Sequence, residues 1–163
     1  MSHIARDWTE FEVVPGNRLR ELKDSEGRHD WYDIPNSGWG AMIAWLAGPS
    51  RVFRVEGQGQ VVVRETIVDG DTGATTTREV PATSSDLWSI DRDRDVYLAE
   101  ANIPPMPSGY TWYLRLDDKQ SSAAFESAVN QAYVACGGRA AVRPSEVRAV
   151  LAEALGSILN RKR

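Results

Sequence analysis

Residues 121–161, SSAAFESAVNQAYVACGGRAAVRPSEVRAVLAEALGSILNR, carry the clearest structural pattern in the chain. Two segments, Ser121–Cys136 and Pro144–Arg161, place apolar residues at the spacing of an amphipathic helix. Gly137-Gly138 between them is typical of a helix end, and Pro144 suits the first turn of the second helix. The stretch therefore predicts two helices that form a hairpin.

The second of these helices has an apolar face that needs cover. Each large aliphatic side chain on it stabilises the protein by about 1.5–3 kcal/mol when fully buried. A narrower stripe of small residues lies beside this face and would let another element approach closely. Packing inside one monomer and packing against a neighbouring subunit explain the two-sided pattern equally well. The apolar face comprises Val147, Val150, Leu151, Ala154, Leu155, Ile158 and Leu159. The small stripe comprises Ser145, Ala149, Ala152 and Gly156.

Short strand-like runs fill the region before the helices. Tyr110–Leu116 is the cleanest of them, since every second residue is large and apolar. The Asp/Gly-rich stretch Asp69–Gly73 joins two β-rich runs, Gln60–Val68 and Ala74–Val80, in the pattern of a hairpin. Further strands are predicted at Trp8–Val14, His29–Ile34, Arg51–Glu56, Trp88–Ile90 and Val96–Ala101.

One helix is predicted inside this strand-rich region. Ser37 is a suitable N-cap and Gly48-Pro49 a suitable end for it. A buried strand fits the same residues nearly as well. Further along, Ile103–Pro107 contains three prolines; it matches the pattern of polyproline ligands, but a stiff loop is the better explanation. The apolar residues at helical spacing are Trp39, Met42, Ile43 and Leu46.

These elements predict an α+β protein. We expect a mainly antiparallel β-sandwich or partial barrel over residues 1–118, followed by a helical hairpin over residues 119–163. A chain of 163 residues can bury a sufficient core without a metal or a disulfide. Cys136 is the single cysteine, which excludes an internal disulfide, and it is expected to be a small buried hydrophobe.

Charge and hydropathy disfavour two classes of partner. A net charge of −4 argues against nucleic-acid binding, which needs concentrated positive charge. The basic cluster Arg161–Arg163 is better explained by the negative end of the preceding helix. No run approaches the roughly 18 apolar residues of a membrane span, and the N-terminal residues are mostly polar. We therefore expect a soluble protein made in the cytoplasm.

Candidate catalytic groups are sparse. His3 and His29 are the only histidines, and the common nucleotide-binding, serine-hydrolase and zinc-protease motifs are absent. Asp91–Asp95 alternates carboxylates as a calcium loop does, but it lacks the required Gly and Glu, so a solvated, mutually paired charge run is favoured. Asp69 and Asp71 suit a tight turn. The sequence therefore predicts no enzyme activity, no cofactor and no metal.

Six tryptophans are many for a chain of this length. The alternation in its strand predicts that Trp112 belongs to the core. Trp31 and Trp39 lie near Gly and Pro, and we expect both to be partly exposed. Exposed tryptophans act either as anchors of protein interfaces or as flat platforms for sugar rings.

The tryptophan-rich β-region, the excess of Arg (sixteen) over Lys (three), the lack of catalytic motifs and the apolar terminal helix form a recognisable combination. It resembles small structural proteins of tailed phages that infect GC-rich actinobacteria, such as minor tail or baseplate components. The resemblance implies a virion protein that forms a homo-oligomer and contacts other virion proteins. The alternative is a carbohydrate-binding β-sandwich module for a host-surface glycan. The predicted partner surface comprises Val147, Val150, Leu151, Leu155, Ile158, Leu159, Trp31 and Trp39.

Overall fold

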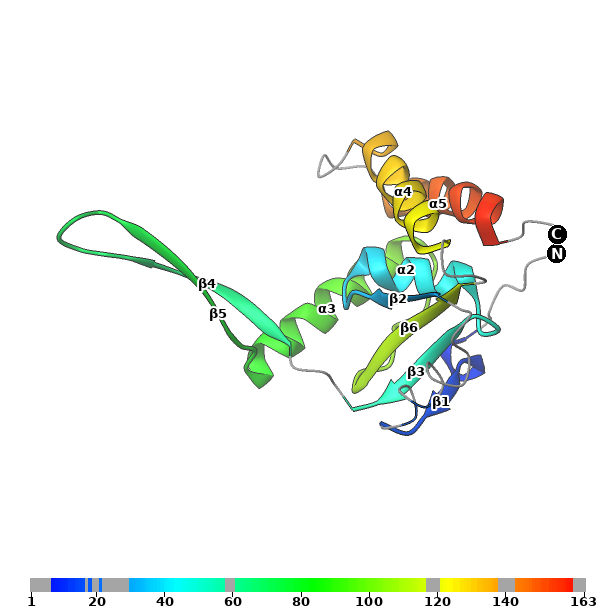
Figure 1. Ribbon diagram of the computed structural model, residues 1–163, viewed down its shortest axis with the longest axis horizontal. Helices are drawn as coiled ribbons and strands as arrows, with labels where there is room; N and C mark the ends of the chain where they lie inside the picture. The colour runs from blue at the N-terminus through cyan, green and yellow to red at the C-terminus, as the bar shows by residue number, and fades with distance from the viewer. Residues whose placement is uncertain are drawn as a thin grey trace.

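A four-stranded sheet with the order β1-β3-β6-β2 forms the centre of the fold (Figure 1). β6 (Tyr110–Leu116) is antiparallel to both of its neighbours, β3 (Val52–Glu56) and β2 (Asp30–Ile34), and β1 (Glu12–Val14) pairs parallel with β3. Alternate residues of β6 are buried, so the predicted strand is confirmed. The computed structural model describes residues 7–16, 18, 21, 30–57, 61–116, 121–137 and 143–159.

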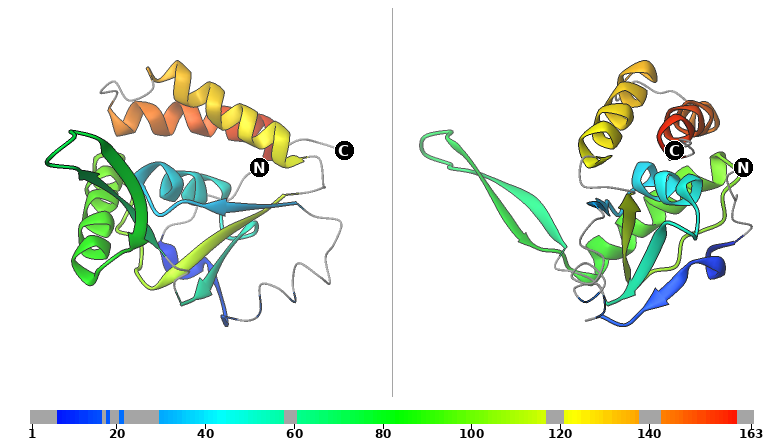
Figure 2. Two further views of the ribbon diagram at one scale, coloured as in Figure 1. Left: turned by 60° about the vertical axis from the view of Figure 1, so that its left-hand side comes forward. Right: turned by 45° about the vertical axis from the view of Figure 1, so that its right-hand side comes forward.

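The helices cover the sheet in two layers (Figure 2). α2 (Gly38–Ala47) packs against β2 and β6, and α3 (Ser84–Glu100) packs beside α2. α5 (Pro144–Leu159) lies on α2 and α3, and α4 (Ser121–Ala135) lies against α5 and β2. One hydrophobic core therefore connects the sheet with all four helices.

α2 resolves the ambiguity between helix and strand in favour of the helix. The Ser37 side chain accepts a hydrogen bond from the Gly40 amide, which caps the first turn, and Gly48 ends the helix with φ of 90°. Most of its side chains are buried, because α2 lies between the sheet and α5. A helix that is apolar all round belongs inside a protein, which explains why its sequence also fitted a buried strand.

The N-terminal strand prediction needs a correction. Trp8–Glu10 forms a 3-10 turn, η1, and only the following Glu12–Val14 is a strand. Asp7 and Glu10 form a reciprocal capping box around this turn, which satisfies backbone amides that a strand would have paired. The turn brings Trp8 into an aromatic cluster with ring centroids 4.8–5.7 Å apart. The cluster comprises Trp8, Phe11, Trp45 and Trp112.

The two strands predicted at Trp88–Ile90 and Val96–Ala101 are wrong, because both segments belong to α3. Thr83 and Asp86 form a capping box that starts the helix. Its two fully buried residues, Arg94 and Leu98, lie one turn apart. The helical period was hidden because an arginine, not an aliphatic residue, occupies a core-facing position.

β4 (Val62–Val68) and β5 (Thr75–Pro81) form a separate antiparallel hairpin that projects from the body (Figure 1). The predicted hairpin is confirmed. We call β4, β5 and their turn the arm. The arm does not lie on the central sheet, so the expected sandwich or partial barrel takes the form of one helix-covered sheet with a projecting hairpin, and the described strands close no barrel.

The α+β class and the C-terminal helical pair are confirmed. α4 and α5 begin and end within two residues of the predicted helices. Both contribute to the same core as Trp112 of the sheet. The division of the chain into residues 1–118 and 119–163 stays a prediction.

Candidate interaction surface

The apolar face of α5 is covered within a single chain. Its four largest contributors to the core are at most 8% exposed and pack with residues of α2, α3 and α4. The prediction that these four residues belong to a partner surface is therefore corrected: packing within one chain buries them, and they have no free surface to offer a partner. They are Val147, Leu151, Leu155 and Leu159.

The other predicted partner residues are partly buried. Val150 and Ile158 lie at the border of the covered face of α5. The Trp31 ring packs 5.8 Å from the Phe53 ring on the far side of the sheet. The Trp39 ring meets the Tyr133 ring of α4 at 5.5 Å in an edge-to-face arrangement. The structure does not bring the two tryptophans and the α5 residues together into one surface.

The arm is the most exposed regular element among the described residues. Nearly all of its side chains are exposed, including three large aliphatic ones that all belong to β4, and Val68 is 63% exposed. A two-stranded hairpin that buries so little is marginally stable by itself in water. The exposed aliphatic residues are Val62, Ile67 and Val68.

Both outer edges of the arm present backbone hydrogen-bonding groups. Asp69 donates its amide to the Ala74 carbonyl, and Ala82 donates to Val61, at the two ends of the hairpin. With the observed register, these bonds direct the odd-numbered β4 backbone groups toward β5. The even-numbered groups, from Val62 to Val68, therefore face outward. On β5 the odd-numbered groups, from Thr75 to Pro81, face outward.

The turn of the arm is held by Asp69. Its carboxylate accepts hydrogen bonds from the amides of Asp71 and Thr72, at 2.8 and 3.3 Å, and these bonds lower the pKa of the Asp69 carboxyl. Gly73 supplies the positive φ of 73° that closes the turn. The prediction that Asp69 and Asp71 serve a tight turn is confirmed. At neutral pH the tip of the arm is thus ordered and acidic.

A buried arginine fixes the position of α3, from which the arm emerges. Arg94 is 2% exposed, and its guanidinium contacts the carboxylates of Asp91 at 3.3 Å and Asp95 at 3.0 Å. It also donates to Asn36 Oδ1 at 2.7 Å and to the Met106 carbonyl at 2.5 Å. The charges of Asp91–Asp95 are therefore mutually paired as expected, but the run is not solvated at Arg94, which ties α3 to the segments before α2 and β6.

The carboxylates around Arg94 are themselves satisfied. Asp91 accepts from Asn36 Nδ2 at 3.1 Å and from Ser108 Oγ at 2.7 Å, and Asp95 accepts from the Met106 amide at 3.1 Å. A network with every member paired stabilises one arrangement of its elements. This cluster is accordingly structural, and no group of three or more His, Cys, Asp or Glu suited to a metal occurs among the residues described.

The outer side of α3 carries an exposed strip that the sequence did not predict. Trp88 is 62% exposed and Val96 57% exposed, and each lies one turn from Arg92 on the same side of the helix. The Arg92 guanidinium lies 4.9 Å from the centroid of the Trp88 ring. The predicted strands at Trp88–Ile90 and Val96–Ala101 do not place these residues on one surface. The spacing of four between residues 88, 92 and 96 is the pattern in the sequence that indicates a shared helix face.

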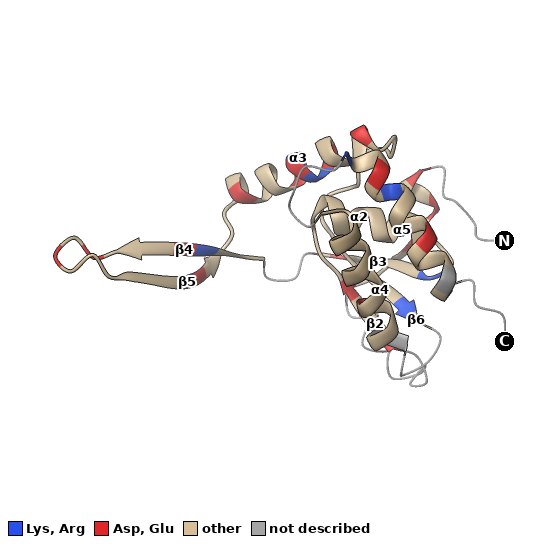
Figure 3. Cartoon of the chain, turned by 90° about the horizontal axis from the view of Figure 1, so that it is seen from above, with Lys and Arg blue, Asp and Glu red and all other residues tan. Residues whose placement is uncertain are grey.

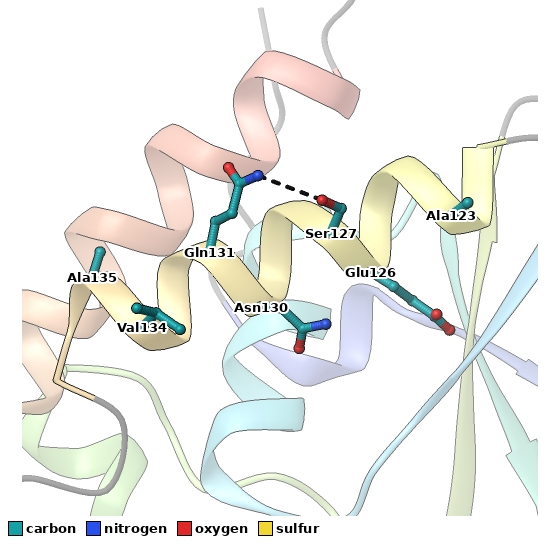
Figure 4. A pocket seen from close by; sticks show the side chains of 7 residues that line it. All are labelled: Ala123, Glu126, Ser127, Asn130, Gln131, Val134 and Ala135. Carbon is teal, nitrogen blue, oxygen red and sulfur yellow. Dashed lines mark hydrogen bonds between the residues drawn. The ribbon is translucent and has the colours of Figure 1, made fainter.

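Other surface features are less promising. A shallow groove follows the outer face of α4, where polar side chains surround the exposed Val134 (Figure 4). A smaller polar pocket lies near Glu100 and Ser145.

In the part of the chain that is described, no helix is long and apolar enough to cross a membrane. The predictions that concern His3, His29 and Arg161–Arg163 lie outside the described residues.

Burial keeps Tyr32, Tyr97 and Cys136 neutral near pH 7. Burial, helped by the nearby Cys136, raises the pKa of the Tyr97 hydroxyl to about 12. Burial also raises the pKa of Tyr32, to which Glu126 adds. Burial and the charge of Glu146 raise the pKa of the Cys136 thiol, so the expectation of a small buried hydrophobe is confirmed.

A family of unknown function (DUF5956) matches residues 6–159. No curated protein and no solved structure matches the chain. The match includes the sheet, the arm and all four described helices.

Proposed function

The chain belongs to this family of unknown function, and we propose that it is a non-enzymatic assembly protein that forms a homo-oligomer through its arm. The observation that carries the proposal is the shape of β4 and β5: a regular hairpin that leaves the body and exposes nearly every side chain. Such an element contributes little to the core of its own chain. Its exposed edges and aliphatic residues are suited to bind another chain.

The charges of the arm also favour association. Residues 66–68 and 75–77 are uncharged, and Figure 3 shows the outer part of the arm largely free of charged residues up to the acidic tip. Edge strands that remain monomeric commonly carry inward-pointing charges or lysines. The outer half of this arm has neither, so nothing there opposes contact with another strand.

The virion setting is a separate part of the proposal. We place the oligomer in the tail or baseplate of a tailed phage, on the resemblance described above, with other virion proteins as further contacts. An assembly role in a virion is compatible with a protein whose polar clusters are structural. A reading frame for a tape-measure protein beside this gene would support that setting.

A carbohydrate-binding role is the weaker proposal. It requires an open aromatic face, whereas Trp31 packs on Phe53 and Trp39 on Tyr133. Trp88 is more exposed, but the Arg92 guanidinium occupies one face of its ring. If binding to a glycan array disappeared on Trp31→Ala while the arm-truncated protein still bound, the carbohydrate role would be favoured instead.

Truncation of the arm should abolish self-association and leave the body folded. Val63 and Val80 are opposite each other in the register, as a hydrogen-bonded pair, so Asn-Gly can replace residues 64–79 as a two-residue turn. We expect light scattering after size-exclusion chromatography to give an oligomer for the wild type and a monomer for the truncated protein.

The control for this experiment is the thermal unfolding of both proteins. The midpoint should change little, because the arm makes few contacts with the body. A wild type that stays monomeric at every concentration, or a truncated protein that associates as the wild type does, would contradict the proposed function.

A further inference from the structure

We infer that the outer edge of β4, which pairs with no described strand, pairs antiparallel with β4 of a second copy, around a two-fold axis at Thr66, to form a continuous four-stranded sheet. The inference rests on the proposed function and specifies its contact. Of the two free edges, β4 carries all three exposed aliphatic residues of the arm, whereas the outward positions of β5 are Thr75, Thr77, Glu79 and Pro81. Pro81 lacks an amide hydrogen, which makes β5 the poorer template.

The pairing register follows from symmetry. A two-fold axis perpendicular to an antiparallel sheet brings the same edge of β4 together from both copies. Residues whose backbone groups face outward in one copy therefore pair with residues whose backbone groups face outward in the other. The choices for the longer overlaps are then registers centred on Arg64, Glu65 or Thr66. The register centred on Arg64 places Arg64 opposite Arg64 of the second copy, and the register centred on Glu65 places Glu65 opposite Glu65. Like charges directly opposite each other destabilise a strand pair.

The register centred on Thr66 avoids this repulsion. Thr66 lies opposite its own copy, Arg64 lies opposite Val68, and Glu65 lies opposite Ile67. The backbone groups of residues 64, 66 and 68 then make intermolecular hydrogen bonds. Val68 and Ile67, both exposed in one copy, gain the aliphatic stems of Arg64 and Glu65 as cover.

The residue pattern of the β4 edge favours a second copy as the occupant. In this register each charged residue of one strand lies opposite an aliphatic residue of the other, so no like charges are directly opposed. The outward backbone groups of residues 64, 66 and 68 meet those of the same three residues in the second copy, so both copies gain the same hydrogen bonds. An unrelated strand would have to reproduce both features.

A cysteine at the proposed axis tests the pairing. In the Thr66→Cys variant the two thiols face each other across the axis at a Cα separation of about 5.5 Å, which a disulfide can span. We expect mild oxidation to convert most of this variant to a covalent dimer on a non-reducing gel, and a reductant to reverse it. Wild type sets the background, because its single thiol, Cys136, is buried.

Thr77→Cys is the matched control, since Thr77 lies opposite Thr66 within the arm and faces the other edge. It should stay at the wild-type background. Cross-linking of Thr77→Cys with none for Thr66→Cys would overturn the inference in favour of the β5 edge. Absence of cross-linking in both, for a protein whose oligomer still depends on the arm, would overturn the edge pairing but leave the proposed function intact.

A proline pair provides a second test without oxidation. Thr66 and Thr77 form a non-hydrogen-bonded pair, so a proline at either site removes an outward amide and no bond within the hairpin. Thr66→Pro should shift light scattering to the monomer, while Thr77→Pro should remain an oligomer. An oligomer that survives Thr66→Pro would contradict pairing through β4.

Discussion

Replacing Arg94 with alanine should lower the free energy of unfolding by about 3–5 kcal/mol, as is usual when one partner of a buried ion pair is removed. The guanidinium supplies donors to two carboxylates, to Asn36 Oδ1 and to the Met106 carbonyl. Without it, the buried Met106 carbonyl and the partly buried carboxylates lose their donor, and a cavity remains beside α3. Chemical denaturation monitored by tryptophan fluorescence measures this loss.

Arg92→Ala is the matched control, two residues away on the same helix. Arg92 is exposed, and its contacts are a 3.4 Å ion pair with Asp93 and the stacking on Trp88. Exposed pairs of this kind contribute roughly 0.2–1 kcal/mol. If Arg94→Ala cost no more than Arg92→Ala, the network around Arg94 would not be what positions α3.

Gly40→Ala should be the second severe change, with a cost of roughly 1–3 kcal/mol or more from overpacking. A Cβ at residue 40 would lie 2.1 Å from the Pro35 carbonyl oxygen and 3.0 Å from its carbon. These are backbone atoms of the turn that leads into α2, so they cannot move aside as a flexible side chain would. The gain of about 1 kcal/mol expected for Gly→Ala within a helix is too small to compensate.

Gly70→Ala is the control for this substitution. Gly70 lies in the turn of the arm, and a Cβ there would meet nothing within 4 Å. Its unfolding midpoint should stay within experimental error of the wild type. A Gly40→Ala protein as stable as Gly70→Ala would show that the turn before α2 can relax, which the contact at Pro35 argues against.

Local patterns in the sequence were sufficient to predict the elements in which one face is apolar and the other polar, or in which a clear turn joins two strands. β6 alternates, and the arm has an Asp/Gly turn between β-branched runs. α4 and α5 each have an apolar face; Gly follows the end of α4, and α5 begins with Pro144. In each case one residue period and one end signal agree with the final structure. Long-range packing then confirmed what local chemistry had already specified.

α3 could not be predicted in this way because its core contacts are unusual. Its inward positions combine Leu98 with Arg94, and the arginine is tolerated only because residues from distant segments supply acceptors. The same error concealed Trp88 as an exposed residue. A local sequence pattern does not predict the burial of a charged side chain whose hydrogen-bond acceptors come from distant segments.

The interaction surface could be predicted only in part. The sequence revealed an apolar helix face that needed cover, but the cover is intramolecular, since α2, α3 and α4 close over α5. The hairpin was predicted, whereas its projection from the body was not. Whether a hairpin lies on a sheet or extends into solvent depends on the connections at its base.

Amide hydrogen exchange of the wild type, resolved by residue at low and high protein concentration, tests the role of the arm most directly. We expect the amides of Thr66 and Val68 to exchange rapidly in dilute protein and to become protected as the concentration rises, while those of Thr75 and Thr77 stay unprotected. Arm amides that exchange equally fast at every concentration, or protection confined to the helices of the body, would contradict that role.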